Sequence, residues 1–447
     1  SPADYAARTV ARNLSTSVRS CADCCDSSVA EDSTWLAVAP VSLAARVTLP
    51  MLDDTRPVPS AASCTLRAIS LVAAPCSSTA EALVVTWDDG AESIYPLLWL
   101  REYSLDPDTF NHQTREQNLA IIDLPDTVSL SSASIAADGM IQVTFETEGL
   151  TSSYHPGWLR THCPQNPTPQ YTLPDRVLWT AKDGSVPPRF DGRNIADNTV
   201  FEGWLGAMRA YGVGLIEQLP VAPGTLETVI DRIGPIRATN FGRLYDVENK
   251  ADTNSNAYTA QPLRAHTDLA TREYQPGIQF FFCMANAVSQ GASILSDGFA
   301  IAERIRQDHP EQYAFLTDHP VMFVNKDKDS EYRYEVPIFE TDYRGNLTTV
   351  RFTYWLREPM TGDITTIKRF HEATSLLHHY ADHPDFQIRF RLPPRDLVGF
   401  DNRRIFHGRD GFDPSEGARW FRGCYLEREE IESRLRVLDR NKRLAGV

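Results

Sequence analysis

The chain has 447 residues, 42% of them apolar, and a formal net charge of −15. This length is enough to bury one large core and a second, smaller one, so we expect two domains. The acidic balance argues against a nucleic-acid partner, which would need a basic stripe. No apolar run approaches the roughly 20 residues that span a bilayer, so we expect no membrane partner either.

Residues 1–63 are rich in Ser, Ala and Pro and contain no Lys. Such a composition cannot bury much apolar surface, and we expect a disordered or loosely docked extension. Arg8, Arg12 and Arg19 near the start are also typical of a mitochondrial presequence or its remnant. Acidic residues soon follow, so we favour a cytoplasmic location and keep a mitochondrial one as the alternative.

Eight cysteines in so long a chain do not indicate a disulfide framework, which makes a reducing compartment the default. Cys283 and Cys424 lie in expected core strands and are interpreted as small buried hydrophobes. Cys21, Cys24 and Cys25 have a spacing that could begin a zinc site, but no second pair of ligands is evident nearby. Their role stays open.

Residues 64–163 predict a small β-rich domain. Short alternating segments at 82–87 and 140–145 are typical of strands, and Asp88-Asp89-Gly90 is typical of a turn. Three prolines between residues 164 and 169 interrupt both helix and sheet patterns. We therefore expect a linker at 164–174 and a catalytic domain at 175–447.

The second domain alternates strand and helix signals. The aromatic run at 277–284 predicts a buried strand, with another strand at 291–296, and helices are expected at 201–211, 298–309 and 364–383. A closing helix around 427–444 carries Ile431, Leu435 and Leu438 on one face. That face is expected to pack on its own domain or on a second subunit, so a homodimer is an open alternative.

The pattern His-x-Asp/Glu occurs three times. His309-Pro310-Glu311 and His383-Pro384-Asp385 each contain a proline near the end of a predicted helix, and we expect turn or cap roles for them. His266-Thr267-Asp268 instead precedes the buried strand at 277–284. In a β-strand, residues i and i+2 share a face, so His266 and Asp268 are expected to bind one metal ion together.

A second histidine and an arginine complete the pattern downstream. His407 would bring a second imidazole, and two imidazoles with one carboxylate leave further coordination positions open, as in non-heme Fe(II) oxygenases. Arg419 follows twelve residues later, and its planar fork suits a carboxylate. We expect this to be the distal carboxylate of 2-oxoglutarate.

From about Leu66 to Leu438 the chain resembles the gamma-butyrobetaine dioxygenase and trimethyllysine dioxygenase family, relatives of taurine dioxygenase. The matching stretches are YPLLWLR at 95–101, NAY at 256–258, HTD at 266–268, PGIQ at 276–279, SDGF at 296–299, FDNRRIFHGR at 400–409 and GCYL at 423–426. The resemblance implies an α+β, mainly β fold, with a double-stranded β-helix (jelly-roll) catalytic core and a small N-terminal β-rich domain. It implies Fe(II), 2-oxoglutarate and O2, with ascorbate as a supporting reductant.

Some family members hold a zinc ion in the N-terminal domain through cysteines just after the Trp-Leu-Arg stretch. Residues 102–109 of this chain contain no cysteine. We therefore expect no structural zinc.

The family also implies a substrate pocket. Phe241, Tyr245 and Tyr258 match aromatic positions that box a trimethylammonium group, because the negative faces of the rings attract a cation. Ordinary core packing is the alternative reading of these rings. Ser255 and Leu269 stand where the butyrobetaine enzyme holds the substrate carboxylate, and Leu269 has no group that would bind one.

Three further positions bear on the pocket. Trp355 occupies a place near the 2-oxoglutarate where the family tends to have asparagine. Ser293 is expected to assist the cosubstrate or to be a plain strand serine. Arg422 would be a second anion contact or a surface charge, and we favour the latter.

These observations predict an Fe(II)/2-oxoglutarate-dependent dioxygenase that hydroxylates an unactivated C–H bond of a small amino-acid or betaine-like substrate, releasing succinate and CO2. One alternative is a specialised-metabolism oxygenase that performs hydroxylation, desaturation or ring formation on another scaffold. A less favoured alternative is a jelly-roll protein that binds a metal or ligand without turnover. Fold and motif do not name the substrate.

Overall fold

The computed structural model describes residues 66–73, 81–167, 171–249 and 256–445. The chain divides into two compact units, Ser1–Thr168 and Pro169–Val447. This division falls inside the expected 164–174 linker, while the other domain boundaries stay predictions. The expected 1–63 extension and the cysteines at 21, 24 and 25 lie outside the described residues.

The first unit contains two antiparallel three-stranded sheets, β1-β2-β3 and β6-β7-β8, and a short β4-β5 pair among its described residues. Its strands are β1 (Leu66–Ala73), β2 (Glu81–Trp87), β3 (Glu92–Pro96), β4 (Phe110–Asn111), β5 (Glu116–Gln117), β6 (Leu130–Ile135), β7 (Ile141–Phe145) and β8 (Leu150–Tyr154). Its helices are α2 (Leu97–Glu102), η1 (Ile121–Asp123) and α3 (Pro156–Thr161). The strands predicted at 82–87 and 140–145 are confirmed as β2 and β7.

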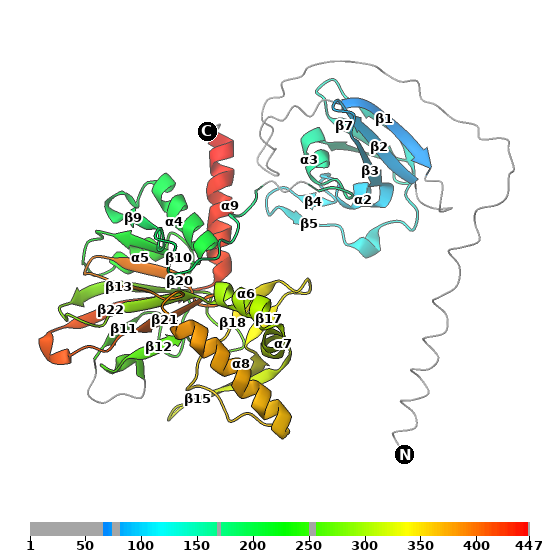
Figure 1. Cartoon of the computed structure of the whole chain (residues 1–447). Helices are drawn as coiled ribbons and strands as arrows, with labels where there is room; N and C mark the ends of the chain where they lie inside the picture. The colour runs from blue at the N-terminus through cyan, green and yellow to red at the C-terminus, as the bar shows by residue number, and fades with distance from the viewer. Residues whose placement is uncertain (1–65, 74–80, 168–170, 250–255, 446–447) are drawn as a thin grey trace. The chain divides into compact units, whose positions relative to one another are not determined.

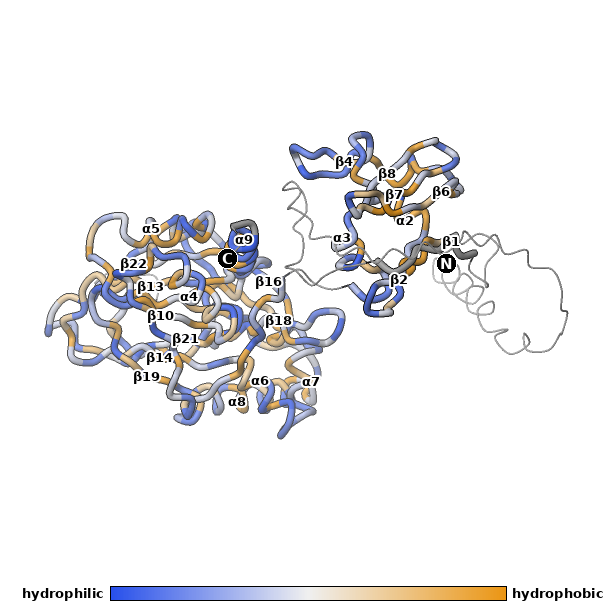
Figure 2. The backbone as a smooth tube through the Cα atoms, turned by 90° about the horizontal axis from the view of Figure 1, so that it is seen from above, coloured by the Kyte–Doolittle hydropathy of each residue, from blue (hydrophilic) through white to orange (hydrophobic). Residues whose placement is uncertain are grey.

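The core of the first unit follows from the alternation along its strands. Ile141, Val143 and Phe145 of β7 are buried, while the residues between them are more exposed. They pack with Leu83 and Val85 of β2 in one apolar cluster. Figure 2 shows hydrophobic and hydrophilic stretches alternating along the described backbone.

The second unit holds the longer elements. Its strands are β9 (Arg189–Asp191), β10 (Val213–Glu217), β11 (Tyr245–Glu248), β12 (Leu263–His266), β13 (Ile278–Asn286), β14 (Ser293–Asp297), β15 (Pro320–Lys326), β16 (Glu331–Pro337), β17 (Phe339–Thr341), β18 (Leu347–Val350), β19 (Ile388–Phe390), β20 (Leu397–Asp401), β21 (Ile405–Arg409) and β22 (Arg419–Leu426). Its helices are η2 (Gly192–Asn194), α4 (Asn198–Tyr211), α5 (Thr225–Ile230), η3 (Asn256–Tyr258), α6 (Gly298–Asp308), α7 (Pro310–Asp318), α8 (Ile364–Asp382), η4 (Pro414–Glu416) and α9 (Arg428–Ala445).

Six of the described strands form the larger sheet, in the order β11-β22-β13-β20-β10-β9, with β13 near its centre (Figure 1). One face of this sheet packs on α4 and α9. Phe280 and Phe282 of β13 and Trp204 of α4 are fully buried in that core, together with Ile431 and Leu435 of α9. The apolar face of the predicted closing helix therefore packs on its own unit, and the homodimer remains untested.

The opposite face of the large sheet shares a core with a four-stranded sheet in the order β12-β21-β14-β19. Val398, Phe400 and Phe421 of the large sheet are buried against Leu295 and Ile405 of the smaller one. The strands predicted at 277–284 and 291–296 are confirmed as β13 and β14. These two sheets form the walls between which the functional side chains lie.

Helices α6, α7 and α8 pack together beside the smaller sheet (Figure 1). The helices predicted at 201–211, 298–309 and 364–383 are confirmed as α4, α6 and α8, whereas α7 was not predicted. His309 lies between α6 and α7, and His383 is the C-cap of α8, which confirms cap roles for these two His-Pro sites. No helix within the described ranges is both long and apolar enough to cross a membrane.

Candidate active site

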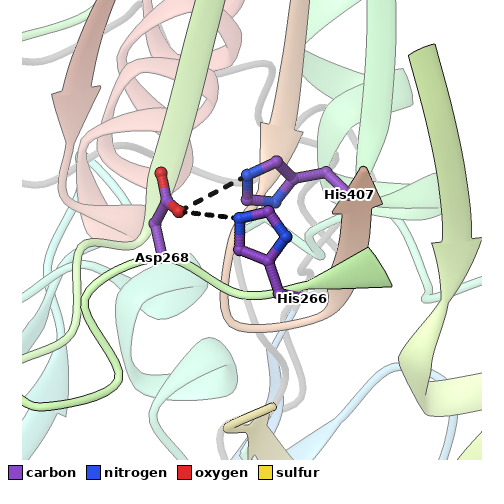
Figure 3. Close-up of side chains that lie close together, drawn as sticks. All are labelled: His266, Asp268 and His407. Carbon is purple, nitrogen blue, oxygen red and sulfur yellow. Dashed lines mark ion pairs between the residues drawn. The ribbon is translucent and has the colours of Figure 1, made fainter. Parts of the chain in front are cut away.

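Two histidines meet across the smaller sheet. His266 is the last residue of β12 and His407 lies at the middle of β21, and the antiparallel pairing of these strands sets the two residues opposite each other. Their ring centroids are 4.2 Å apart. The Oδ1 atom of Asp268 lies 3.2 Å from Nε2 of His266 and 3.5 Å from Nε2 of His407 (Figure 3). One ligand atom from each residue thus faces a common point.

The backbone path to Asp268 differs from the prediction. β12 ends at His266, so Asp268 lies in the following turn, and the expectation that both residues share a strand face was wrong. Leu269 adopts a left-handed conformation with φ of 54°, which is uncommon for a residue with a side chain. The turn leaves the sheet and brings the carboxylate back over the strand end.

Polar side chains hold this turn in place. Asp268 N–H donates to Oδ1 of Asn402 at 2.8 Å, and Nδ2 of Asn402 donates to the carbonyl oxygen of Asp268 at 3.0 Å. The same carbonyl accepts a hydrogen bond from Nε2 of Gln275 at 2.8 Å. Both backbone groups of Asp268 are therefore fixed by residues far from it in sequence, which maintains the unusual turn.

The carboxylate itself is also held. Its Oδ2 atom accepts hydrogen bonds from Nε2 of Gln279 and from the hydroxyl of Tyr425, each at 2.7 Å. Oδ1 is left to face the two histidines. Nδ1 of His266 lies 2.8 Å from the carbonyl oxygen of Arg264, so this nitrogen donates and the lone pair of Nε2 points toward Asp268.

The charge states suit a metal. Burial works to raise the pKa of Asp268, but its interactions with His407 and His266 outweigh this effect, and the pKa lies well below its usual value. Burial and the neighbouring His266 lower the pKa of His407. An ionised carboxylate and neutral imidazoles are the forms that bind metal ions.

Arg419 carries a buried charge that has no counter-ion among the residues that the structure describes. Its guanidinium lies 4.3 Å from the ring centroid of Phe421 and 5.2 Å from that of Phe412. Its Nε has no hydrogen-bond partner among the described residues. Burial, together with nearby Arg409, lowers the pKa of Arg419 to about 9. An anion bound next to Arg419 would neutralise this buried positive charge.

Arg409 is the second buried arginine of the site. It donates to the backbone carbonyls of Ala257, Thr259 and Gln261, the last two at 2.6 and 2.9 Å. Burial lowers its pKa to about 10. Most N–H groups of Arg409 donate to backbone carbonyls, so Arg419 has more N–H groups that could donate to a ligand.

One cavity of about 270 Å³ unites these groups. The predicted site residues that line it are Phe241, Tyr245, Tyr258, His266, Asp268, Leu269, Ser293, Trp355, His407 and Arg419. Ser255 lies outside the described residues. Arg422 is not among the lining residues, and it forms an ion pair with Asp246 at 3.0 Å.

Aromatic rings form one wall of the cavity. The Tyr245 ring lies 6.0 Å from Phe241 and stacks on Tyr425 at 5.1 Å. Gly423 lies opposite Tyr245 in the sheet, and a Cβ there would be only 2.6 Å from atoms of the Tyr245 ring. The missing side chain leaves room for the ring. Trp355 contacts His266 edge-on at 4.8 Å.

The roles of Gln275, Gln279, Asn402 and Tyr425 were missed from sequence. A signal existed for Gln279, because an amide inside the apolar run of β13 needs a buried partner. Asn402 and Tyr425 stood in stretches that carry the family resemblance, but nothing in those stretches indicates a contact with Asp268. That contact depends on how three separate segments meet.

Comparisons with known proteins agree with this geometry. Residues 178–425 match the model of the family described as "Taurine catabolism dioxygenase TauD, TfdA family". A gamma-butyrobetaine dioxygenase of Pseudomonas sp. strain AK-1 is 39% identical, over 82% of this chain and 96% of that protein. A trimethyllysine dioxygenase of Meyerozyma guilliermondii is 27% identical, over 80% and 94%. Human gamma-butyrobetaine dioxygenase is 23% identical, over 80% and 95%.

The donor set fits the cofactors of such enzymes. Two imidazole nitrogens and one carboxylate oxygen converge, as non-heme iron requires, and all three ligand atoms lie within 4.8 Å of one another. The buried charge of Arg419 lies in the same cavity and suits the carboxylate of 2-oxoglutarate. The chain therefore belongs to the taurine catabolism dioxygenase TauD, TfdA family and is an Fe(II)/2-oxoglutarate-dependent dioxygenase.

Proposed function

We propose that His266, Asp268 and His407 hold Fe(II), and that Arg419, assisted by Ser293, binds the distal carboxylate of 2-oxoglutarate. The convergence of the three ligand atoms supports the first assignment. The buried, incompletely bonded guanidinium supports the second. Ser293 belongs to β14 and lines the same cavity as Arg419, which supports its assignment as a cosubstrate contact.

When bound, iron and 2-oxoglutarate activate O2 and supply the oxidising power for hydroxylation, with succinate and CO2 as by-products. The protein orients the reactants and excludes water. Leu295, Phe400 and Phe421 contribute apolar surface to the cavity lining. Gln279 and Tyr425 keep the carboxylate of Asp268 in one orientation, so the ligand does not have to reorganise during the reaction.

The substrate proposed is a small betaine-like cation of the gamma-butyrobetaine type. The observation that carries this proposal is the aromatic wall formed by Phe241, Tyr245 and Tyr258 in the same cavity as the metal ligands. Ring faces attract a cation that has no hydrogen-bond donors, and they do so more strongly where water is excluded. Tyr425, stacked on Tyr245, extends the wall toward Asp268.

Three finer assignments accompany this function. The six-stranded and four-stranded sheets form the two walls of a double-stranded β-helix, supported by their shared core. Residues 64–163 and 175–447 are the N-terminal β-rich domain and the catalytic domain. The enzyme acts on a small molecule in the cytoplasm.

The test is succinate release from 2-oxoglutarate under air with Fe(II) and ascorbate. Gamma-butyrobetaine, trimethyllysine and a panel of uncharged amino acids are compared as substrates. Succinate formation stimulated by a trimethylammonium compound, with a hydroxylated product found by mass spectrometry, is the expected result. Stimulation only by uncharged compounds would reject the cationic substrate and keep the enzyme class.

A second candidate is an oxygenase whose substrate lacks a carboxylate at the far end. Leu269 and Trp355 both line the cavity, and neither side chain carries a positive charge that would pair with a carboxylate. Under this alternative, choline-like cations without a carboxylate would stimulate succinate release more than gamma-butyrobetaine does. The same assay distinguishes the two candidates.

A further inference from the structure

Gln279 occupies an unexpected place for a polar side chain. It lies on β13, near the centre of the large sheet, and it is fully buried. Phe281, two residues later on the same strand face, lines the catalytic cavity. Its cross-strand neighbours are Phe400 and Tyr425, which also line the cavity. The amide is therefore part of the layer directly behind the metal ligands.

The contacts of Gln279 use both hydrogens of its amide nitrogen. Nε2 donates to Oδ2 of Asp268 at 2.7 Å and to the hydroxyl of Tyr245 at 3.0 Å, with a longer contact of 3.5 Å to the hydroxyl of Tyr425. An amide NH2 has two donors, so this group is fully engaged. Its Oε1 is buried and has no hydrogen-bond partner among the described residues. An unsatisfied buried oxygen is destabilising, and the hydrogen bonds of Nε2 offset this cost.

The orientation of the Gln279 amide affects both Asp268 and Tyr245. With the nitrogen toward Asp268, Oδ2 accepts from Gln279 and from Tyr425, and only Oδ1 remains for a metal. Turning the amide over would place Oε1 against an ionised carboxylate and repel it. On the other side, the bond to the hydroxyl fixes the position of the Tyr245 ring in the aromatic wall.

We propose that Gln279 is a positioning residue that makes Asp268 a one-oxygen metal ligand and ties the Tyr245 ring to that ligand. The metal site and the aromatic wall are then mechanically connected through one amide. A substrate that settles against Tyr245 acts on the orientation of Asp268, and a metal on Asp268 orders the wall. This inference rests on the metal-binding roles proposed above.

The test is the metal affinity of Gln279→Met, which keeps the length of the side chain and removes both donors. Mn(II) is titrated into the full chain without O2, and bound metal is read by electron paramagnetic resonance. Loss of a residue that orients a metal ligand typically weakens affinity by about 10- to 100-fold, and that is the expected change. The matched control is Gln387→Met, since Gln387 is also buried and bonded through Nε2, to Ala381, outside the cavity.

A second variant tests the shared oxygen. Tyr425→Phe removes one hydroxyl, the other donor to Oδ2. Since both residues act on one atom, the double variant should weaken metal affinity by less than the product of the two single effects. In addition, gamma-butyrobetaine should alter the resonance spectrum of bound Mn(II) in the unaltered chain and should alter it much less in Gln279→Met.

The outcomes separate the two proposals. If the unaltered chain binds no Mn(II), the proposed metal roles fail before Gln279 is tested. If it binds and Gln279→Met binds equally well with the same spectral response, the positioning role is overturned. Should Gln279→Met lose its folded circular dichroism spectrum, Tyr425→Phe alone decides, and unchanged affinity in that variant overturns the inference.

Discussion

Two groups in the cavity lining, called here the arginine end (Arg419) and the aromatic end (Phe241, Tyr245 and Tyr258), are proposed to recognise charge by different means. At one end Arg419 presents a buried guanidinium whose Nε has no hydrogen-bond partner among the described residues, and we propose that it binds an anion through direct hydrogen bonds. At the other end Phe241, Tyr245 and Tyr258 present rings, and burial of Tyr245, followed by the charge of Asp268, raises its pKa well above the usual value. The phenol stays neutral there. Arg419 supplies a full charge, whereas the aromatic residues supply only polarisable ring faces.

This difference sets the size and selectivity of the response to mutation. A hydrogen bond to a charged group contributes about 1.5–3 kcal/mol. A cation over a ring contributes about 0.5–2 kcal/mol. We therefore expect the arginine end to tolerate change less well than the aromatic end, and the metal ligands to tolerate it least of all.

The largest effect is expected for His407→Ala, which removes one of the three proposed metal ligands. Turnover should fall by more than about 100-fold, because losing a direct ligand should exceed the cost of losing a residue that only orients one. Succinate release and bound metal are measured together. His371→Ala, an exposed change on α8, is the control. Normal metal content in His407→Ala would contradict the assignment.

Arg419→Met alters the arginine end alone. The side chain keeps its packing on Phe421 but loses its charge, so the KM for 2-oxoglutarate should rise by roughly 10- to 150-fold. The KM for the organic substrate should change little. Steady-state kinetics with each substrate varied in turn provide the measurement. Arg422→Met serves as the control, since that charge is paired with Asp246 outside the cavity lining, and an equal rise there would refute the role of Arg419.

Tyr258→Leu weakens the aromatic end. The KM for a trimethylammonium substrate should rise by about 2- to 30-fold, the equivalent of one cation–ring contact. A neutral analogue with carbon in place of nitrogen should be affected far less. Both compounds are compared in the same assay, with Tyr343→Leu, 88% exposed, as control. Equal losses for the charged and neutral compounds would mean that the ring serves only as packing.

The smallest effect is expected for Tyr245→Phe, which keeps the ring and removes its hydroxyl. The preference for a cation over its neutral analogue should persist. Metal affinity should fall by about 2- to 10-fold, because Gln279 loses one of the two acceptors nearest to its Nε2. Mn(II) titration and substrate competition are the measurements. Loss of the cation preference would show that the hydroxyl, rather than the ring face, recognises the substrate.

The metal ligands were predictable from sequence, and the means of holding them were not. The spacing of His266, Asp268, His407 and Arg419 carries the chemistry, and the aromatic positions followed from the family resemblance. The strand assignment of Asp268 failed because periodicity does not detect a left-handed residue such as Leu269. A turn of this kind is stabilised by distant partners, which one-dimensional patterns do not reveal.

Sequence patterns also did not reveal the partners of Gln279, which lies behind the metal ligands. Gln279 gave a signal as a polar residue in a buried run, yet its partners come from β11, β22 and the turn after β12. Helix α7 was missed because its start shares the His309-Pro310 site that ends α6. Amphipathic α9, in contrast, was predicted to within a residue at each end.

A substitution at Gly423 could alter the substrate specificity without replacing any residue that lines the cavity. A methyl group at this position would collide with the back of the Tyr245 ring and push it toward the substrate space. A single-nucleotide change of a glycine codon to alanine would thus narrow the cavity while every group that faces the ligand keeps its identity. Selection or engineering for a smaller substrate can act from behind the wall.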